Sequence, residues 1–391
     1  MRKLVPPVLL TGLMAGALMD PGTIAALAKP VPSGSADDVG EAARAGQWQL
    51  GALRLPEAWR SSRGEGVVVA VLDTGVNPRH PDLEGAIIQG PDLTGAGRGP
   101  WGPHGTAMAS LIAGRRHDGG RRGVIGVAPA AQVLSVRVTL ENGDPRRAKN
   151  PSMNPSVRSD ALAEGIRYAA DHGAGVISMS LGGGSGAWEG SAAEEAAVRY
   201  AIGKGAVLVA SSGNDGDSGN RKNFPAAYPG VIAVGAVDRR MTVAPFSNRQ
   251  DYLSVVAPGT EIVTADGDDS YVVGDGTSSA AATVAGIAAL VRSAHPGLSP
   301  HQVRMAIELG TRRRPPGGYS PAYGHGVANA LLALREADRL ARPASAPPRP
   351  GRYFGAGPAP ASRMPVVAGL VLLMVAMSGW VVLRHRGRDS T

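Results

Sequence analysis

Three short segments place an aspartate, a histidine and a serine among small residues and glycines. Asp73 ends the apolar run VVVAVLD, His104 stands in GPHGTAMA, and Ser278 stands in GDGTSSAAATVAG. These residue types, in this chain order, can perform acyl transfer. The serine hydroxyl attacks a carbonyl carbon, the imidazole takes and returns the proton, and the carboxylate fixes the imidazole tautomer.

Each of these residues also has an ordinary structural explanation when it is taken alone. Asp73 fits an Asx-turn, His104 fits a structural histidine, and Ser278 fits a helix N-cap. As a set at the ends of strands and helices, the three favour catalysis. Asn214, in VASSGNDG at the end of another strand, would supply an amide to an oxyanion. The helix start at Ser278 also favours developing negative charge.

Alternating strands and helices must position these residues. The predicted strands cover residues 67–72, 133–138, 176–181, 206–211 and 231–237, and the predicted helices cover 106–114, 159–172 and 192–204. This alternation predicts an α/β fold with a doubly wound parallel sheet and helices on both faces. In such a sheet, functional groups gather at the carboxyl ends of the strands, where Asp73 and Asn214 stand.

Composition excludes several classes of function. The chain of 391 residues has no cysteine, which rules out disulfides, cysteine-ligated zinc and thiol catalysis. Aromatic residues make up only 4%, too few for a single-strand nucleic-acid platform that stacks bases, and the net charge of +8 is mild. We therefore expect no nucleic-acid partner. The 43% of hydrophobic residues suffices for a sizeable core.

The blocks DTGV, HGTAMA, SGND and GTSSAAATVAG, around Asp73, His104, Asn214 and Ser278, resemble the signature blocks of the subtilisin-like serine proteases, or subtilases. The resemblance covers residues 51–340. It implies a serine endopeptidase that cleaves peptide bonds through an acyl-enzyme. In that enzyme Asp73, His104 and Ser278 form the triad, Asn214 is the oxyanion donor, and no cofactor is used.

The same resemblance assigns a substrate-binding strand to residues 180–183. Its members are Ser180, Leu181, Gly182 and Gly183. An exposed edge that ends in glycines lets a peptide substrate add as an extra strand. Residues 141–157 and 183–191 look like insertions that follow strands. They are either plain surface loops or specificity loops, in which case Trp188 would lie over the cleft.

Two positions depart from the subtilase pattern. Ala282 stands four residues after Ser278, where the family usually has proline, and it allows a regular helical turn. Asp82 matches a family calcium ligand, but the partner loop 119–123 carries arginines where oxygen ligands would be needed. We therefore expect no metal, and we expect Asp82 to cap a turn or to pair with an arginine.

Both ends of the chain predict export and a membrane anchor. Residues 1–28 read as a signal peptide, with a membrane anchor or a cytosolic tail as the alternatives, and 29–50 as a short N-terminal extension. Residues 341–364 form a Pro/Ala-rich stalk. Residues 365–383 match one transmembrane helix, with a buried core helix as the alternative, and the basic tail 384–391 would be cytoplasmic.

This organisation resembles the mycosins, the membrane-anchored subtilases associated with type VII secretion. The shared features are the signal peptide, QWQL at 47–50, the stalk, the single span and the short basic tail, although mycosins commonly carry cysteine pairs that this chain lacks. The resemblance implies a single-pass protease of the cell membrane, with its catalytic domain outside the cytoplasm and exported or secretion-apparatus proteins as substrates. One alternative is a structural partner of the secretion complex in which proteolysis is dispensable. A second, weaker alternative is a general nutritional protease.

Overall fold

A large, mostly parallel sheet organises the first unit of the chain. The computed structural model describes residues 29–30, 36–97, 101–117, 122–146, 160–182, 190–342 and 377. The chain divides into two units, residues 1–341 and 342–391. The fold described below is that of the first unit.

The large sheet has nine strands among the described residues. Their order across it is β13 (Thr311–Arg312), β14 (Val327–Ala328), β10 (Leu253–Pro258), β9 (Ile232–Val237), β8 (Val207–Ser211), β7 (Val176–Met179), β2 (Val68–Asp73), β6 (Gln132–Arg137) and β3 (Ile87–Asp92). Neighbouring strands pair in parallel except at the edge, where β13 runs antiparallel to β14. The predicted α/β fold with a parallel sheet is confirmed.

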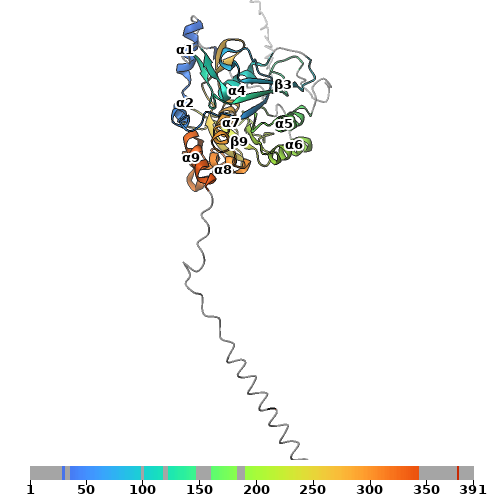
Figure 1. Cartoon of the computed structure of the whole chain (residues 1–391), viewed down its shortest axis with the longest axis vertical. Coiled ribbons are helices and arrows are strands. Elements are labelled where there is room, and N and C mark those ends of the chain that lie inside the picture. The colour runs from blue at the N-terminus through green and yellow to red at the C-terminus, as the bar shows by residue number, and fades with distance from the viewer. Residues whose placement is uncertain are drawn as a thin grey trace, which may run out of the picture. The chain divides into compact units, whose positions relative to one another are not determined.

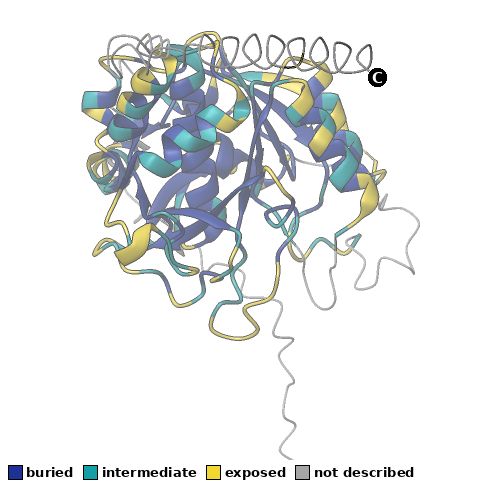
Figure 2. Ribbon diagram, turned by 90° about the horizontal axis from the view of Figure 1, so that it is seen from below, coloured by how far each residue is buried: buried dark blue, intermediate teal, exposed yellow. Residues whose placement is uncertain are grey.

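Helices cover both faces of this sheet (Figure 1). On one face lie α4 (Pro103–Ala113), α7 (Thr277–Ala294), α8 (Pro300–Leu309) and α9 (Ala330–Ala341). On the other face lie α5 (Ala161–Asp171) and α6 (Ala192–Gly203). Successive side chains of a strand point to opposite faces, and in β2 Val69 and Val71 accordingly join the first core while Ala70 and Leu72 join the second. Figure 2 shows the strands buried between helices whose outer faces are exposed.

Several further elements are short. They are α2 (Gln49–Ala52), α3 (Leu55–Ala58), the 3-10 helices η1 (Pro81–Leu83) and η4 (Pro316–Gly318), the pair β4 (Arg115–His117) and β5 (Arg122–Ile125), and the pair β11 (Ile262–Asp266) and β12 (Ser270–Gly274). The topological switch of the large sheet falls at β2, because the chain leaves it towards β3 on one side and later adds β7 on the other. Ligands of open α/β sheets bind at such a point.

The N-terminal extension packs against the side of the fold. Its strand β1 (Lys29–Pro30) pairs with β12, and its helix α1 (Ala36–Gly46) contacts β5. The amide of Gln47 then exchanges two hydrogen bonds with the backbone of Ile125, both of 2.9 Å. The side chain thereby satisfies backbone groups at the end of β5 as a further strand would.

The predicted signal peptide 1–28 lies outside the described residues. So do the stalk beyond residue 342, the span 365–383 apart from Met377, and the tail 384–391. Among the residues that are described, no helix is both long enough and apolar enough to cross a membrane. The predicted boundaries of all these segments stay predictions.

Candidate active site

Asp73 and His104 form a hydrogen-bonded pair at the carboxyl end of β2, in which the aspartate is buried and the histidine is partly exposed. Asp73 is only 1% exposed, and its Oδ1 accepts the backbone N–H of Thr74 at 2.7 Å. The same oxygen lies 2.8 Å from Nδ1 of His104, in the first turn of α4. Because a carboxylate only accepts, Nδ1 carries the proton, and Nε2 is left as the basic nitrogen.

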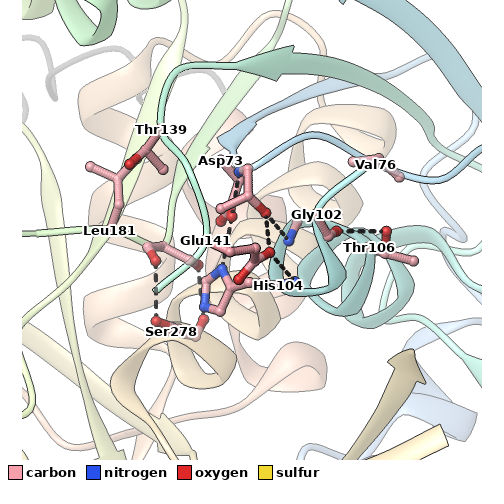
Figure 3. A network of polar contacts seen from close by, with 12 residues as sticks. Asp73, Val76, Gly102, His104, Thr106, Thr139, Glu141, Leu181 and Ser278 are labelled. Atoms are coloured by element: carbon pink, nitrogen blue, oxygen red, sulfur yellow. Dashed lines mark hydrogen bonds and ion pairs between the residues drawn. The ribbon is translucent and has the colours of Figure 1, made fainter. Parts of the chain in front are cut away.

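Ser278 lies in the first turn of α7, and Figure 3 shows the ring of His104 between Asp73 and Ser278. The N-cap of α7 is Gly276, so the N-cap explanation for Ser278 is wrong. The Ser278 hydroxyl donates to the carbonyl of Ser180 at 3.1 Å, and the Ser180 hydroxyl donates to the carbonyl of Ser278 at 2.9 Å. This reciprocal pair fixes the serine against the segment that follows β7.

Asn214 follows β8 and is held by the start of α7. Its Oδ1 accepts the backbone N–H of Thr277 at 2.9 Å and the Thr277 hydroxyl at 2.8 Å. With Oδ1 committed, Nδ2 is free to donate elsewhere. A Cβ built on Gly276 would lie 3.7 Å from both Asn214 Nδ2 and the backbone N of Ser278. Both donors therefore lie near one point beside Gly276, and both are of the kind that stabilises an oxyanion.

The predicted substrate-binding segment follows β7 directly. The Leu181 carbonyl accepts the Ser211 hydroxyl at 3.3 Å, while Gly183 and Trp188 lie outside the described residues. The buried side-chain amide of Asn223 packs against Gly182 and leaves no space for a Cβ at residue 182. Asn223 is itself held by a 2.8 Å hydrogen bond to the carbonyl of Ser211. A backbone approaching Gly182 thus meets no side chain from that residue.

Asp82 has other partners than the sequence suggested. It is fully buried and accepts hydrogen bonds from His117 Nδ1 at 2.7 Å, the backbone N of Val124 at 2.8 Å and the Tyr271 hydroxyl at 2.9 Å. These partners are a histidine of β4, a backbone amide of β5 and a tyrosine of β12. Arg121 of the loop lies outside the described residues, so the expected pairing with an arginine stays a prediction. No group of three or more potential ligands among the described His, Cys, Asp and Glu residues is arranged to hold a metal ion.

Ala282 is buried in the interior of α7, which runs without interruption from Thr277 to Ala294. The regular turn expected from alanine at this position is present. Sequence reasoning missed two groups that bear on the site, the side chains of Thr74 and Glu141, which bond to each other and to the start of α4. The position of Glu141 in the sequence could have indicated its role, because it follows β6, the strand that pairs with the Asp73 strand β2.

Comparison with known proteins identifies the family of this chain. The model of the Subtilase family matches residues 64–326, which is more than half of the chain. This chain belongs to the subtilase family. It is thereby a member of a family of serine proteases, with the subtilisin-like fold that the sequence motifs implied.

Two curated relatives and one solved structure illustrate the likeness. Fervidolysin of Fervidobacterium pennivorans is 35% identical over 338 residues, 78% of this chain, and this match spans only 46% of fervidolysin's own length. Thermitase of Thermoactinomyces vulgaris is 37% identical over 258 residues, 66% of this chain and 85% of thermitase. A structure of the serine protease MycP1, described as an essential component of the type VII (ESX-1) secretion system, gives a TM-score of 0.64 at 32% identity. It covers 78% of this chain and 92% of that one.

Proposed function

We propose that this chain is a serine endopeptidase that cleaves peptide bonds through an acyl-enzyme. The observation that carries the proposal is the Asp73–His104 pair at the carboxyl end of β2, with Ser278 beside it in Figure 3. Asn214, after β8, is bonded to the start of the helix that carries Ser278. The residue types are those that nucleophilic acyl transfer uses, and Nε2 of His104 is the base that we propose for the Ser278 hydroxyl.

In the first half of the reaction, Ser278 Oγ attacks the carbonyl carbon and its proton passes to His104 Nε2. The Asp73 carboxylate stabilises the imidazolium through Nδ1–H, 2.8 Å away. The oxyanion accepts hydrogen bonds from Asn214 Nδ2 and the Ser278 backbone N–H. The C–N bond then breaks, and the proton on His104 goes to the leaving amine.

In the second half, water attacks the acyl carbon of the ester on Ser278. His104 takes the proton of the water as the new C–O bond forms, and then returns it to Ser278 Oγ as the ester bond breaks. The peptide substrate binds as an extended strand beside Ser180, Leu181, Gly182 and Gly183. In that position its backbone pairs with the segment after β7.

The type and place of the enzyme are further parts of the proposal. We propose a mycosin-type protease of the cell membrane, anchored by residues 365–383, with its catalytic domain outside the cytoplasm. It would act on exported or secretion-apparatus proteins. The charge and hydropathy patterns of the two ends support the topology, and the likeness to MycP1 supports the link to type VII secretion.

Covalent labelling with a fluorophosphonate probe tests the enzyme activity. We expect the full-length protein to be phosphonylated at Ser278, and we expect Ser278→Ala and His104→Ala to abolish labelling. Ser279→Ala is the matched control, because that neighbouring serine is buried at 7% exposure and has no part in the proposed mechanism. Labelling that persists in Ser278→Ala, or that maps to another residue, contradicts the proposal.

A second experiment separates proteolysis from an assembly role. Ser278→Ala is introduced into the chromosomal copy, and substrate processing and secretion are then measured independently. Loss of both supports a protease whose cleavage drives secretion. Normal secretion with lost processing favours a structural partner of the secretion complex in which proteolysis is dispensable.

A further inference from the structure

A second carboxylate lies beside the Asp73–His104 pair and is not used in the mechanism above. Glu141 follows β6, the strand that pairs with β2, and its Oε1 accepts two hydrogen bonds (Figure 3). One comes from the backbone N–H of His104 at 2.9 Å. The other comes from the hydroxyl of Thr74, the chain neighbour of Asp73, at 2.7 Å. One oxygen atom thus contacts both segments that carry the pair.

The first turn of α4 is capped from outside the helix. Its N-cap residue, Gly102, has no side chain to accept a hydrogen bond, and the first N–H groups of a helix have no partner within it. Glu141 takes the N–H of His104, and the Thr74 hydroxyl oxygen takes the N–H of Gly105 at 3.0 Å. These two side chains therefore set the position of the turn that carries the imidazole.

The packing around this turn leaves little room for adjustment. A Cβ on Gly102 would overlap both Thr74 Oγ1 and Glu141 Oε1, and the Gly102 N–H donates to the carbonyl of Thr74 at 3.2 Å. Within the described residues no side-chain cation pairs with Glu141. The positive end of the α4 dipole instead offsets its charge. The Glu141 side chain is half-buried. Both of the hydrogen bonds described above end on the same atom, Oε1.

We propose that Glu141 is a positioning residue for His104, a role that rests on the protease function proposed above. By holding the first turn of α4 against the end of β2, it keeps the imidazole aligned between Asp73 and Ser278. A displacement of reacting groups by about 1 Å costs on the order of 10²-fold in rate. The same oxygen accepts both hydrogen bonds, so the side-chain carbonyl of a glutamine can replace it.

The test measures fluorophosphonate labelling of the full-length protein, resolved into the rate at saturating probe (kinact) and the half-saturating concentration (KI). We expect Glu141→Ala and the size-matched Glu141→Met to lower kinact by at least about tenfold with KI nearly unchanged. Glu141→Gln should retain most of kinact. The control is Asp144→Ala, since the carboxylate of Asp144 bonds Arg146 of the same loop and contacts neither member of the pair.

Thermal unfolding of each variant first establishes which ones fold, so that the folded member of the Ala and Met pair decides the result. The proposal is wrong if that variant keeps the wild-type kinact, or if Glu141→Gln loses as much as it does. A wild type that is not labelled at all overturns the protease assignment together with this inference. Normal labelling of the wild type with unaffected Glu141 variants overturns this inference alone.

Discussion

The hydroxyl of Tyr271 offers a quantitative test of how the chain stabilises the loop around Asp82. Asp82 is fully buried, so it cannot exchange a lost partner for water. Tyr271→Phe removes the 2.9 Å hydrogen bond to Oδ2 and leaves the bonds from His117 and Val124 in place. The ring of Tyr271 is only 4% exposed, and phenylalanine fills the same space.

A hydrogen bond to a charged acceptor is worth about 1.5–3 kcal/mol. At roughly 2–4 °C per kcal/mol for a domain of this size, we expect Tm to fall by about 3–12 °C. The measurement is thermal unfolding followed by circular dichroism, in a Ser278→Ala background that prevents self-digestion. Tyr319→Phe is the matched control, because its half-exposed hydroxyl donates to the backbone carbonyl of Asp251 at 2.6 Å and water can replace it there.

The control should lose no more than about 1 kcal/mol of stability, which corresponds to a fall in Tm of no more than roughly 2–4 °C. A Tyr271→Phe protein with the wild-type Tm, or with no greater loss than Tyr319→Phe, would refute the reasoning. Either result would mean that the carboxylate of Asp82 does not need its third donor, and that the β4–β5 hairpin is held by packing instead.

Two further predictions follow from single contacts. Asn214→Asp keeps the acceptor for Thr277 but replaces the Nδ2 donor by a carboxylate oxygen. The value of kinact for the fluorophosphonate should fall by about 10²–10³, a range carried over from the subtilisins of this family. A loss below tenfold would exclude Asn214 as an oxyanion donor. Burial lowers the pKa of His80 from 6.5, against the opposing pull of Asp82. The unfolded chain therefore binds the proton first, and stability is lost as the pH falls below 6.5. His80→Gln in the Ser278→Ala background should show a smaller loss of Tm between about pH 7 and pH 5 than the parent, and equal losses would refute the assignment.

Local sequence patterns were enough to predict five central strands of the sheet (β2, β6, β7, β8 and β9) and the segments that carry Asp73 and Ser278, but not β3, β10, β13 and β14. The run ending at Asp73 is apolar throughout because β2 is buried on both faces, so its length and its polar end mark a strand. The small residues after Ser278 likewise mark a helix that must pack inside the core. In both places the whole segment has one secondary structure and one pattern of burial. The local sequence is therefore sufficient to identify the element.

The contacts that the sequence did not disclose join residues far apart in the chain. Glu141 stands 37 residues after His104 and 67 after Thr74, and it opens a stretch that reads as a surface insertion. Asp82 meets His117 across 35 residues, although arginines are its nearest basic candidates in the loop pattern. Several basic side chains of this region are candidates to bond the carboxylate of Asp82, and the geometry of the β4–β5 pair determines which of them reaches it. No local pattern carries that geometry.

The helix that bears Ser278 has a consequence for how the protein loses activity. From Ser279 to Val291 every residue of α7 is buried, and the helix contacts β7, β8, β9 and β10 in the centre of the fold. The serine cannot leave its place while these layers stay packed. Loss of activity on heating should consequently coincide with unfolding of the whole catalytic domain. We expect no temperature range in which the domain is folded but inactive.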